Sequence, residues 1–208
     1  MTSGANLLTA RAIPASAAGS SHEPPPIGAA TVSAFVRGFA ALGFDVDALL
    51  ASARVDPDVL RDPDSSIACS QFGAVIGAAY AERRMPNLAL HLATVIPIGA
   101  FPLLDYLILT CSTVGEGLQQ LVRYMRLEQN PAQVGLRLDE SPTRVTVDAP
   151  GNTFSVEFTT ALAVCHLREE TEGRFSPLAV HFAHRPDDVE EFRRILKAPV
   201  TAGSTWNG

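Results

Sequence analysis

The sequence predicts an α+β fold, in which an N-terminal helical layer packs on a small, mainly antiparallel sheet with a long interposed helix. Three observations predict this fold. Apolar residues recur at helical spacing as far as Met125, the period changes to two after Pro131, and a long helical segment then separates the strands. The chain has 208 residues, 47% of them hydrophobic, which is enough to bury one core.

The N-terminal residues 1–28 are rich in Ala, Ser, Gly and Pro and lack periodicity, so we expect a disordered extension. Residues 29–208 then form one domain. Its first half should contain five helical segments. They are Thr31–Leu42, which ends at Gly43; Val46–Ala53; a short helix that starts at Asp56-Pro57; a helix whose N-cap is Ser70; and Leu88–Thr94.

Two consecutive helices in residues 99–130 are the centre of the predicted domain. The first, Leu103–Thr110, is apolar apart from Asp105. A buried carboxylate needs a partner or a raised pKa, so Asp105 either has a structural place, at a helix end as a cap or at an exposed rim, or serves a function. The second begins with a capping box formed by Thr113 and Glu116. It carries one apolar stripe, made of Val114, Leu118, Leu121, Val122 and Met125.

The strands follow in the second half of the chain. Alternation over residues 134–138 and 145–149, with a turn at Ser141-Pro142, predicts a hairpin with one covered face. Phe154–Thr171 reads as a long buried helix. We then expect a strand over residues 178–182, an amphipathic helix over 187–196 and an edge strand from Val200, with Trp206-Asn207-Gly208 ending the chain outside any packed element.

Charge and composition exclude several classes of protein. The net charge of −6 argues against a free-standing nucleic-acid binder, which would show a basic patch. No signal peptide is visible, and the longest apolar run, Leu88–Thr110, is too interrupted for a membrane span. We therefore expect a cytoplasmic protein whose three cysteines are buried, reduced thiols, the alternative being a redox sensor or a ligand.

The common catalytic and nucleotide-binding motifs are absent from the sequence. His181 and His184 form a His-x-x-His, but on a strand they face opposite sides, so we expect no joint metal site and assign His184 a hydrogen bond that closes the strand. His91 and His166 should be hydrogen-bonded core histidines. We expect neither a metal nor another cofactor, and no enzyme activity.

Polar side chains gather near the two central helices. They allow two interpretations: a hydrated rim on a packed helix pair, or a small-molecule pocket with apolar walls and a few convergent polar groups. The candidate ligand-binding residues are Tyr106, Thr110, Arg123, Tyr124, Arg126 and His181.

Four stretches together resemble the N-terminal effector-binding and dimerisation domain of AraC/XylS-family transcription regulators, of the non-cupin, arabinose-binding-like type. They span about residues 29–208 and no single motif is diagnostic. The stretches are Leu42–Leu50 with Asp56-Pro57 and Asp62-Pro63-Asp64; Gly99 to Arg123-Tyr124, including Ser112-Thr113-Val114-Gly115-Glu116-Gly117-Leu118; the hairpin; and Val180–His184 with Pro186, Phe192 and Pro199-Val200.

The resemblance implies a sensory domain that binds a small metabolite between the helical layer and the sheet and forms a homodimer. DNA would be bound only through a C-terminal helix-turn-helix domain, which this chain lacks. Arg123 or Arg126 would meet the carboxylate of an amino-acid-like, fatty-acid-like or aromatic ligand. The alternatives are a ligand-free dimerisation module, or an enzyme or haem sensor with a nucleophile–base pair or an axial histidine.

Overall fold

The computed structural model describes residues 25–102, 105–106, 110–124, 133–137 and 141–208. Its helices are α1 (Ala29–Ala41), α2 (Val46–Ser52), the 3-10 helix η1 (Pro57–Arg61), α3 (Cys69–Glu82), α4 (Leu88–Val95), α6 (Val114–Tyr124), α7 (Thr153–Glu170) and α8 (Val189–Leu196). Its strands are β1 (Ile27–Gly28), β2 (Ser66–Ile67), β3 (Gln133–Arg137), β4 (Arg144–Asp148), β5 (Val180–Phe182) and β6 (Val200–Ala202). The predicted α+β class is confirmed.

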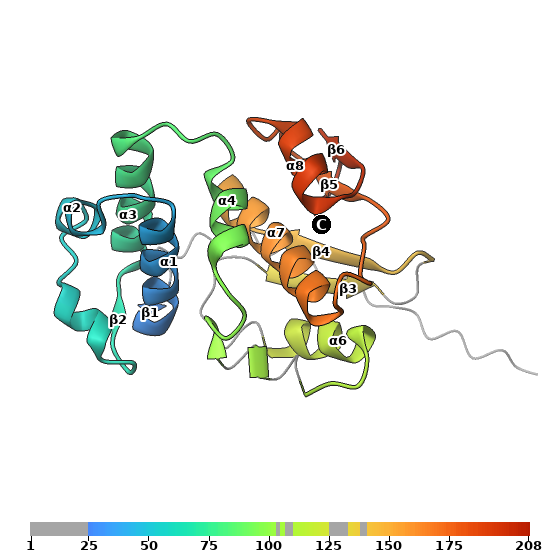
Figure 1. The fold of residues 1–208 in the computed structure, drawn as a ribbon, viewed down its shortest axis with the longest axis horizontal. Helices are drawn as coiled ribbons and strands as arrows, with labels where there is room; N and C mark the ends of the chain where they lie inside the picture. Colours follow the sequence, from blue (N-terminus) through green and yellow to red (C-terminus); the bar gives the residue numbers. More distant parts are fainter. Residues whose placement is uncertain (1–24, 103–104, 107–109, 125–132, 138–140) are drawn as a thin grey trace, which may run out of the picture.

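The first three helices, α1 to α3, form a group at one end of the molecule (Figure 1). The predicted apolar face of α1 buries Val32, Phe35 and Phe39. Phe35 joins this group to the rest of the core, because its ring lies 5.0 Å from that of Phe72 in α3 and 4.5 Å from that of Phe158 in α7, between centroids. Aromatic contacts therefore fasten three helices that are far apart in sequence.

The N-terminus of α3 differs from the prediction. The helix begins at Cys69, two residues earlier than a Ser70 cap allows, and the capping position is Ala68. The Gln71 side chain accepts a hydrogen bond of 3.1 Å from the Ala68 amide, and this satisfies the first turn in place of a serine hydroxyl.

The middle of the molecule is the packed pair α4 and α7, which lie side by side in Figure 1. Five of the eight residues of α4 are buried, so this short helix is apolar on nearly all sides. The predicted helix Phe154–Thr171 corresponds to α7 within one residue at each end. α7 contacts β4 and α6 contacts β3, so the helical layer and the strands do touch, as predicted.

The strands form three separate pairs among the described residues, where the sequence suggested one small sheet. β1–β2 and β3–β4 are antiparallel, and the hairpin register aligns Val134 with Val147 and Leu136 with Val145, as the alternation predicts. β5 and β6 are parallel, because α8 crosses over between them. The expected edge strand at Val200 is therefore half of a small parallel unit.

The last residues of the chain bridge two of these pairs, which corrects the prediction that they end outside a packed element. The carbonyl oxygen of Asn207 accepts from the amide of Val147 in β4 at 3.0 Å. Gly208 exchanges two hydrogen bonds with His181 in β5, of 2.8 and 2.9 Å. We call residues 206–208 the bridging segment, because it joins β4 to β5.

The β5–α8–β6 unit is attached to the helices at both ends of α8. Asn87, just before α4, accepts from the amide of Asp188 at 3.0 Å and donates to the Asp188 carbonyl oxygen at 2.8 Å and to Glu191 Oε2 at 2.9 Å. At the other end, Arg168 of α7 donates to the carbonyl oxygen of Ile195 at 3.1 Å and to that of the next residue. These contacts place the unit against α4 and α7.

Two expectations concern residues at the edge of the described ranges. Ile27 and Gly28, assigned to the extension, form β1 and pair with Ile67 and Ser66, so the packed domain begins before residue 29. Residues 1–24 lie outside the described ranges, as does most of the predicted helix Leu103–Thr110. None of the helices in the described part of the chain is long and apolar enough to cross a membrane.

Candidate functional site

The start of α6 is held by two hydrogen bonds from the loop before it. The Glu116 amide donates to Thr113 Oγ1 at 3.2 Å, which confirms one half of the predicted capping box. The other half is displaced by one residue, because Glu116 Oε2 accepts from the amide of Ser112 at 3.1 Å and not from that of Thr113. The carboxylate is thereby fixed against the loop that precedes the helix.

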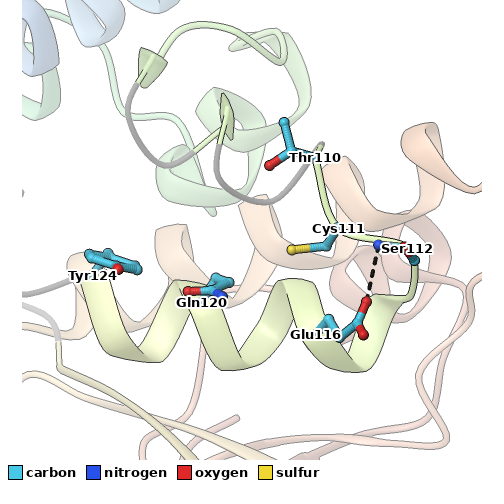
Figure 2. A pocket seen from close by; sticks show the side chains of 6 residues that line it. All are labelled: Thr110, Cys111, Ser112, Glu116, Gln120 and Tyr124. Atoms are coloured by element: carbon cyan, nitrogen blue, oxygen red, sulfur yellow. Dashed lines mark hydrogen bonds between the residues drawn. The ribbon is translucent and has the colours of Figure 1, made fainter.

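A cavity of about 400 Å³ opens between this loop and one face of α6 (Figure 2). Glu116, Gln120 and Tyr124 are spaced four residues apart, so they share one face of the helix and line the floor. Thr110, Cys111 and Ser112 form the opposite lip. The volume falls within the range of about 300–1,000 Å³ typical of small-molecule sites.

The cavity contains two of the six residues that the sequence suggested, Thr110 and Tyr124. Arg123 is exposed, and its guanidinium carbon lies 5.4 Å from the centre of the Tyr124 ring, beside the cavity lining. Tyr106 is 68% exposed and is not part of the lining. Arg126 lies outside the described residues.

Four lining residues are not among the predicted ligand-binding residues: Cys111, Ser112, Glu116 and Gln120. The signal that could have found two of them is the polar row at positions 116, 120 and 124, which lies beside the apolar stripe of the same helix. None of the described lining residues belongs to a strand. The cavity is therefore a helix–loop site, and not the helix–sheet site that the sequence suggested.

Asp105 holds the turn that leads from α4 toward this loop. Its side chain is buried, with 7% exposure, and Oδ2 accepts from the amides of Gly99 at 2.7 Å and Phe101 at 3.0 Å. Its Oδ1 lies 3.8 Å from Nδ1 of His166, and Nε2 of His166 lies 3.0 Å from the carbonyl oxygen of Ile96. Of the roles left open for Asp105, capping is the one observed, and His166 is a hydrogen-bonded core histidine as predicted.

The environment of His166 acts on its pKa in two directions. Burial lowers the pKa, but the hydrogen bond and charge of Asp105, the Ile96 carbonyl and the charge of Glu169 together raise it above the ordinary value of 6.5. The protonated imidazole is therefore the form that the fold favours, and it bridges α7 to the turn after α4.

The two histidines of the His-x-x-His have different neighbours, as the strand geometry predicts. The His184 ring nitrogen Nε2 lies 2.7 Å from Oε1 of the buried Glu157, and the His181 ring packs on Trp206 with 4.5 Å between centroids. Burial raises the pKa of Glu157, His184 partly opposes this, and Asp187 adds to it. His181 thus lies against the bridging segment and does not line the α6 cavity.

The three cysteines are half-buried, where the sequence suggested full burial, and none is in a disulfide. Burial raises the pKa of the Cys165 thiol, which keeps it in the neutral form. Cys111 lies at the lip of the cavity. No group of three His, Cys, Asp or Glu side chains is arranged to hold a metal ion within the described ranges.

Comparison with known proteins gives the family. The profile described as the arabinose-binding domain of AraC transcription regulators, N-terminal, matches residues 43–208. No curated protein matches the chain. The fold is similar to that of the transcriptional regulator CdpR from Pseudomonas aeruginosa, with a TM-score of 0.51 and 17% identity over 75% of this chain and 50% of the CdpR chain.

This chain therefore spans half the length of the solved regulator that it matches, and the likeness at that identity concerns the fold alone. The family profile covers most of the chain, including the whole of the α6 site. It follows that the chain belongs to the family of N-terminal arabinose-binding domains of AraC transcription regulators.

Proposed function

We propose that this chain is the sensory domain of a transcription regulator and that it binds a small metabolite in the cavity beside α6. The observation that carries the proposal is the row Glu116, Gln120 and Tyr124, which places polar groups along one wall of a cavity of about 400 Å³. Family membership supports a regulatory role, and we assign the site binding and no catalytic step.

The regulatory output in this proposal is a change in DNA binding by a helix-turn-helix domain in the whole regulator, in the cytoplasm. Ligand binding can shift such an equilibrium only if the two states differ in affinity for the ligand. The cavity lip at Thr110–Ser112 follows, along the chain, the turn held by Asp105 and His166. A ligand that holds the lip would therefore also act on this turn, and through His166 on α7. We infer that this route links the site to the rest of the domain.

The proposal also includes a homodimer. Val114, Leu118 and Val122 lie on one side of α6 and are only half-buried, so a second copy could cover them. The same observation favours the second candidate function, a dimerisation module without a ligand. The two candidates differ in whether any small molecule stabilises the domain.

A thermal-shift panel of amino acids, short fatty acids, small aromatic acids and small aliphatic amines tests the sensory function. A ligand present at 100 times its Kd stabilises by about 2.7 kcal/mol, which for a chain of this size raises Tm by about 5–10 °C. Gln120→Trp should abolish the shift by filling the cavity. Gln119→Trp, on the exposed neighbouring position of the same helix, is the matched control and should retain it.

Failure of every compound to shift Tm would refute ligand sensing and leave the dimerisation module. Sedimentation equilibrium tests the dimer independently: the wild-type chain should sediment as a dimer, and Leu118→Glu should shift it to the monomer because a charge would be buried in the interface. A monomeric wild-type chain at all concentrations would refute the dimer.

A further inference from the structure

The cavity beside α6 has a distinctive charge. Of the six described residues that line it, only Glu116 has a charged side chain at neutral pH, and no described Lys, Arg or His belongs to the lining. The whole chain also carries a net charge of −6. A cleft lined by one sign of charge concentrates ligands of the opposite sign, so the field here favours a cation.

The carboxylate is held in place for such a ligand. One of its oxygens, Oε2, accepts a hydrogen bond from the Ser112 amide at 3.1 Å, and this bond fixes the carboxylate at the lip (Figure 2). We assign its other oxygen, Oε1, to the ligand. Gln120 follows four residues later on the same face, a rise of about 6 Å along the helix. Its amide oxygen and the Tyr124 hydroxyl are further acceptors along the wall.

A carboxylate ligand fits this lining poorly. It would approach Glu116 without a cation in the lining to pair with, and Arg123 is exposed and rests beside the Tyr124 ring. Like charges brought together oppose binding, although Glu116 is exposed and solvent weakens this repulsion. Arg123 does not line the cavity, and Arg126, the other arginine expected to receive a ligand carboxylate, lies outside the described residues.

Resting on the proposed sensory function, we infer that the cavity takes a small aliphatic amine, whose ammonium group binds Glu116 and whose second hydrogen-bond donor binds Gln120. A charge-assisted hydrogen bond from ammonium to carboxylate supplies the affinity. The rise of about 6 Å along the helix between successive residues of the row suits a chain of about four carbons between two donors. Tyr124 then closes the far end of the site.

Three four-carbon probes test this inference on the full 208-residue chain: butane-1,4-diamine, butane-1,4-diol and succinate. They share length and differ in the charge of their ends. We expect the diamine alone to raise Tm and to bind by isothermal titration. Glu116→Gln should weaken the diamine about two- to fivefold, because it removes the charged partner from an exposed ion pair.

The matched control is Asp47→Asn, which removes one exposed carboxylate from the first turn of α2, far from the cavity lining. It should leave diamine binding unchanged. Glutamine can replace glutamate in a capping box, so Glu116→Gln should fold, and its Tm without ligand checks this. If that variant does not fold, the salt dependence of wild-type binding decides, since recognition by charge must weaken as salt is raised.

Equal binding of the diamine to wild type and Glu116→Gln, or binding that ignores salt, would overturn the inference. So would a stronger effect of succinate or the diol than of the diamine. In those cases a Tm shift from any compound that Gln120→Trp abolishes still supports a sensory site. Absence of a shift from every compound would overturn both proposals together.

Discussion

Asn87 offers the sharpest test of how the β5–α8–β6 unit is attached to the helices. The residue is buried, with 2% exposure, and has a φ of 52°, in the left-handed region. Its amide group makes three hydrogen bonds across a separation of about a hundred residues, two to the backbone of Asp188 and one to the Glu191 carboxylate. We predict that Asn87→Gly and Asn87→Ala both lower the free energy of unfolding.

The size of the effect follows from these contacts. A hydrogen bond between neutral groups contributes about 0.5–1.5 kcal/mol and one to a charged group about 1.5–3 kcal/mol. Asp188 is exposed, so water replaces part of what is lost, and we expect Asn87→Gly to cost about 2–4 kcal/mol. Asn87→Ala should cost about 1 kcal/mol more, because alanine is less tolerant of positive φ.

Urea denaturation followed by circular dichroism measures both variants against wild type. Glu191→Gln is the companion variant: it keeps an acceptor for Asn87 and removes the charge, so its cost should be smaller than that of Asn87→Gly. If the free energies of unfolding of both Asn87 variants lie within about 0.5 kcal/mol of the wild-type value, the reasoning fails. Changes that small are typical of exposed surface positions, and not of a buried residue that makes three hydrogen bonds.

Three further predictions concern buried charges and helix packing. Because the pKa of His166 is raised, the stability that the protonated ring contributes is complete below pH 6.5 and is lost as the pH rises through the raised pKa. Between about pH 6 and about pH 8, the Tm of the wild type should therefore fall more steeply than that of His166→Gln. Parallel curves of Tm against pH would contradict this. His184→Ala strands the buried carboxylate of Glu157 and should cost about 3–5 kcal/mol in urea, with partial recovery when Glu157→Gln is added. Gly38→Ala should lower Tm at a cost of about 1–3 kcal/mol, because the new Cβ would come 3.0 Å from two side chains near α4. At Gly73 a new Cβ would have no neighbouring atom within 4 Å, so Gly73→Ala should raise Tm slightly. Equal responses of the two variants would refute the packing argument.

Local signals in the sequence predicted the helices well. α7 is predicted within one residue at each end, since its length and apolar content leave few alternatives and Asn152 caps it by accepting from the amide of Ser155 at 2.9 Å. The predicted start of α3 was wrong by two residues because Gln71, three positions after Ala68, can satisfy the first turn without a serine. Helix ends depend on which of several neighbouring side chains makes the bond, and periodicity does not decide that.

Pairing between strands is where the sequence analysis failed. A period of two identifies which side of β5 is covered, but neither its partner nor its direction. The parallel pairing with β6 depends on α8 packing against α4 and α7, and the bridging segment has only three residues, too few for any periodic signal. These arrangements are non-local, so no window along the chain contains them.

The candidate site was predicted in part for the same reason. Thr110 and Tyr124 were found from their position near the central helices, and they do line the cavity. His181 was among the predicted ligand-binding residues, but the bridging segment brings Trp206 against it. Glu116 was read as a capping residue, which it is, and its second place in the lining depends on where the loop lies.

The bridging segment has a consequence for the order of folding. The β3–β4 hairpin is a local structure that can form soon after its residues leave the ribosome. Its join to β5 depends on Asn207 and Gly208, which are synthesised about 60 residues after β4 ends. During synthesis, the edges of β4 and β5 that bind the bridging segment therefore stay unpaired. They gain their hydrogen bonds only when Asn207 and Gly208 have been synthesised.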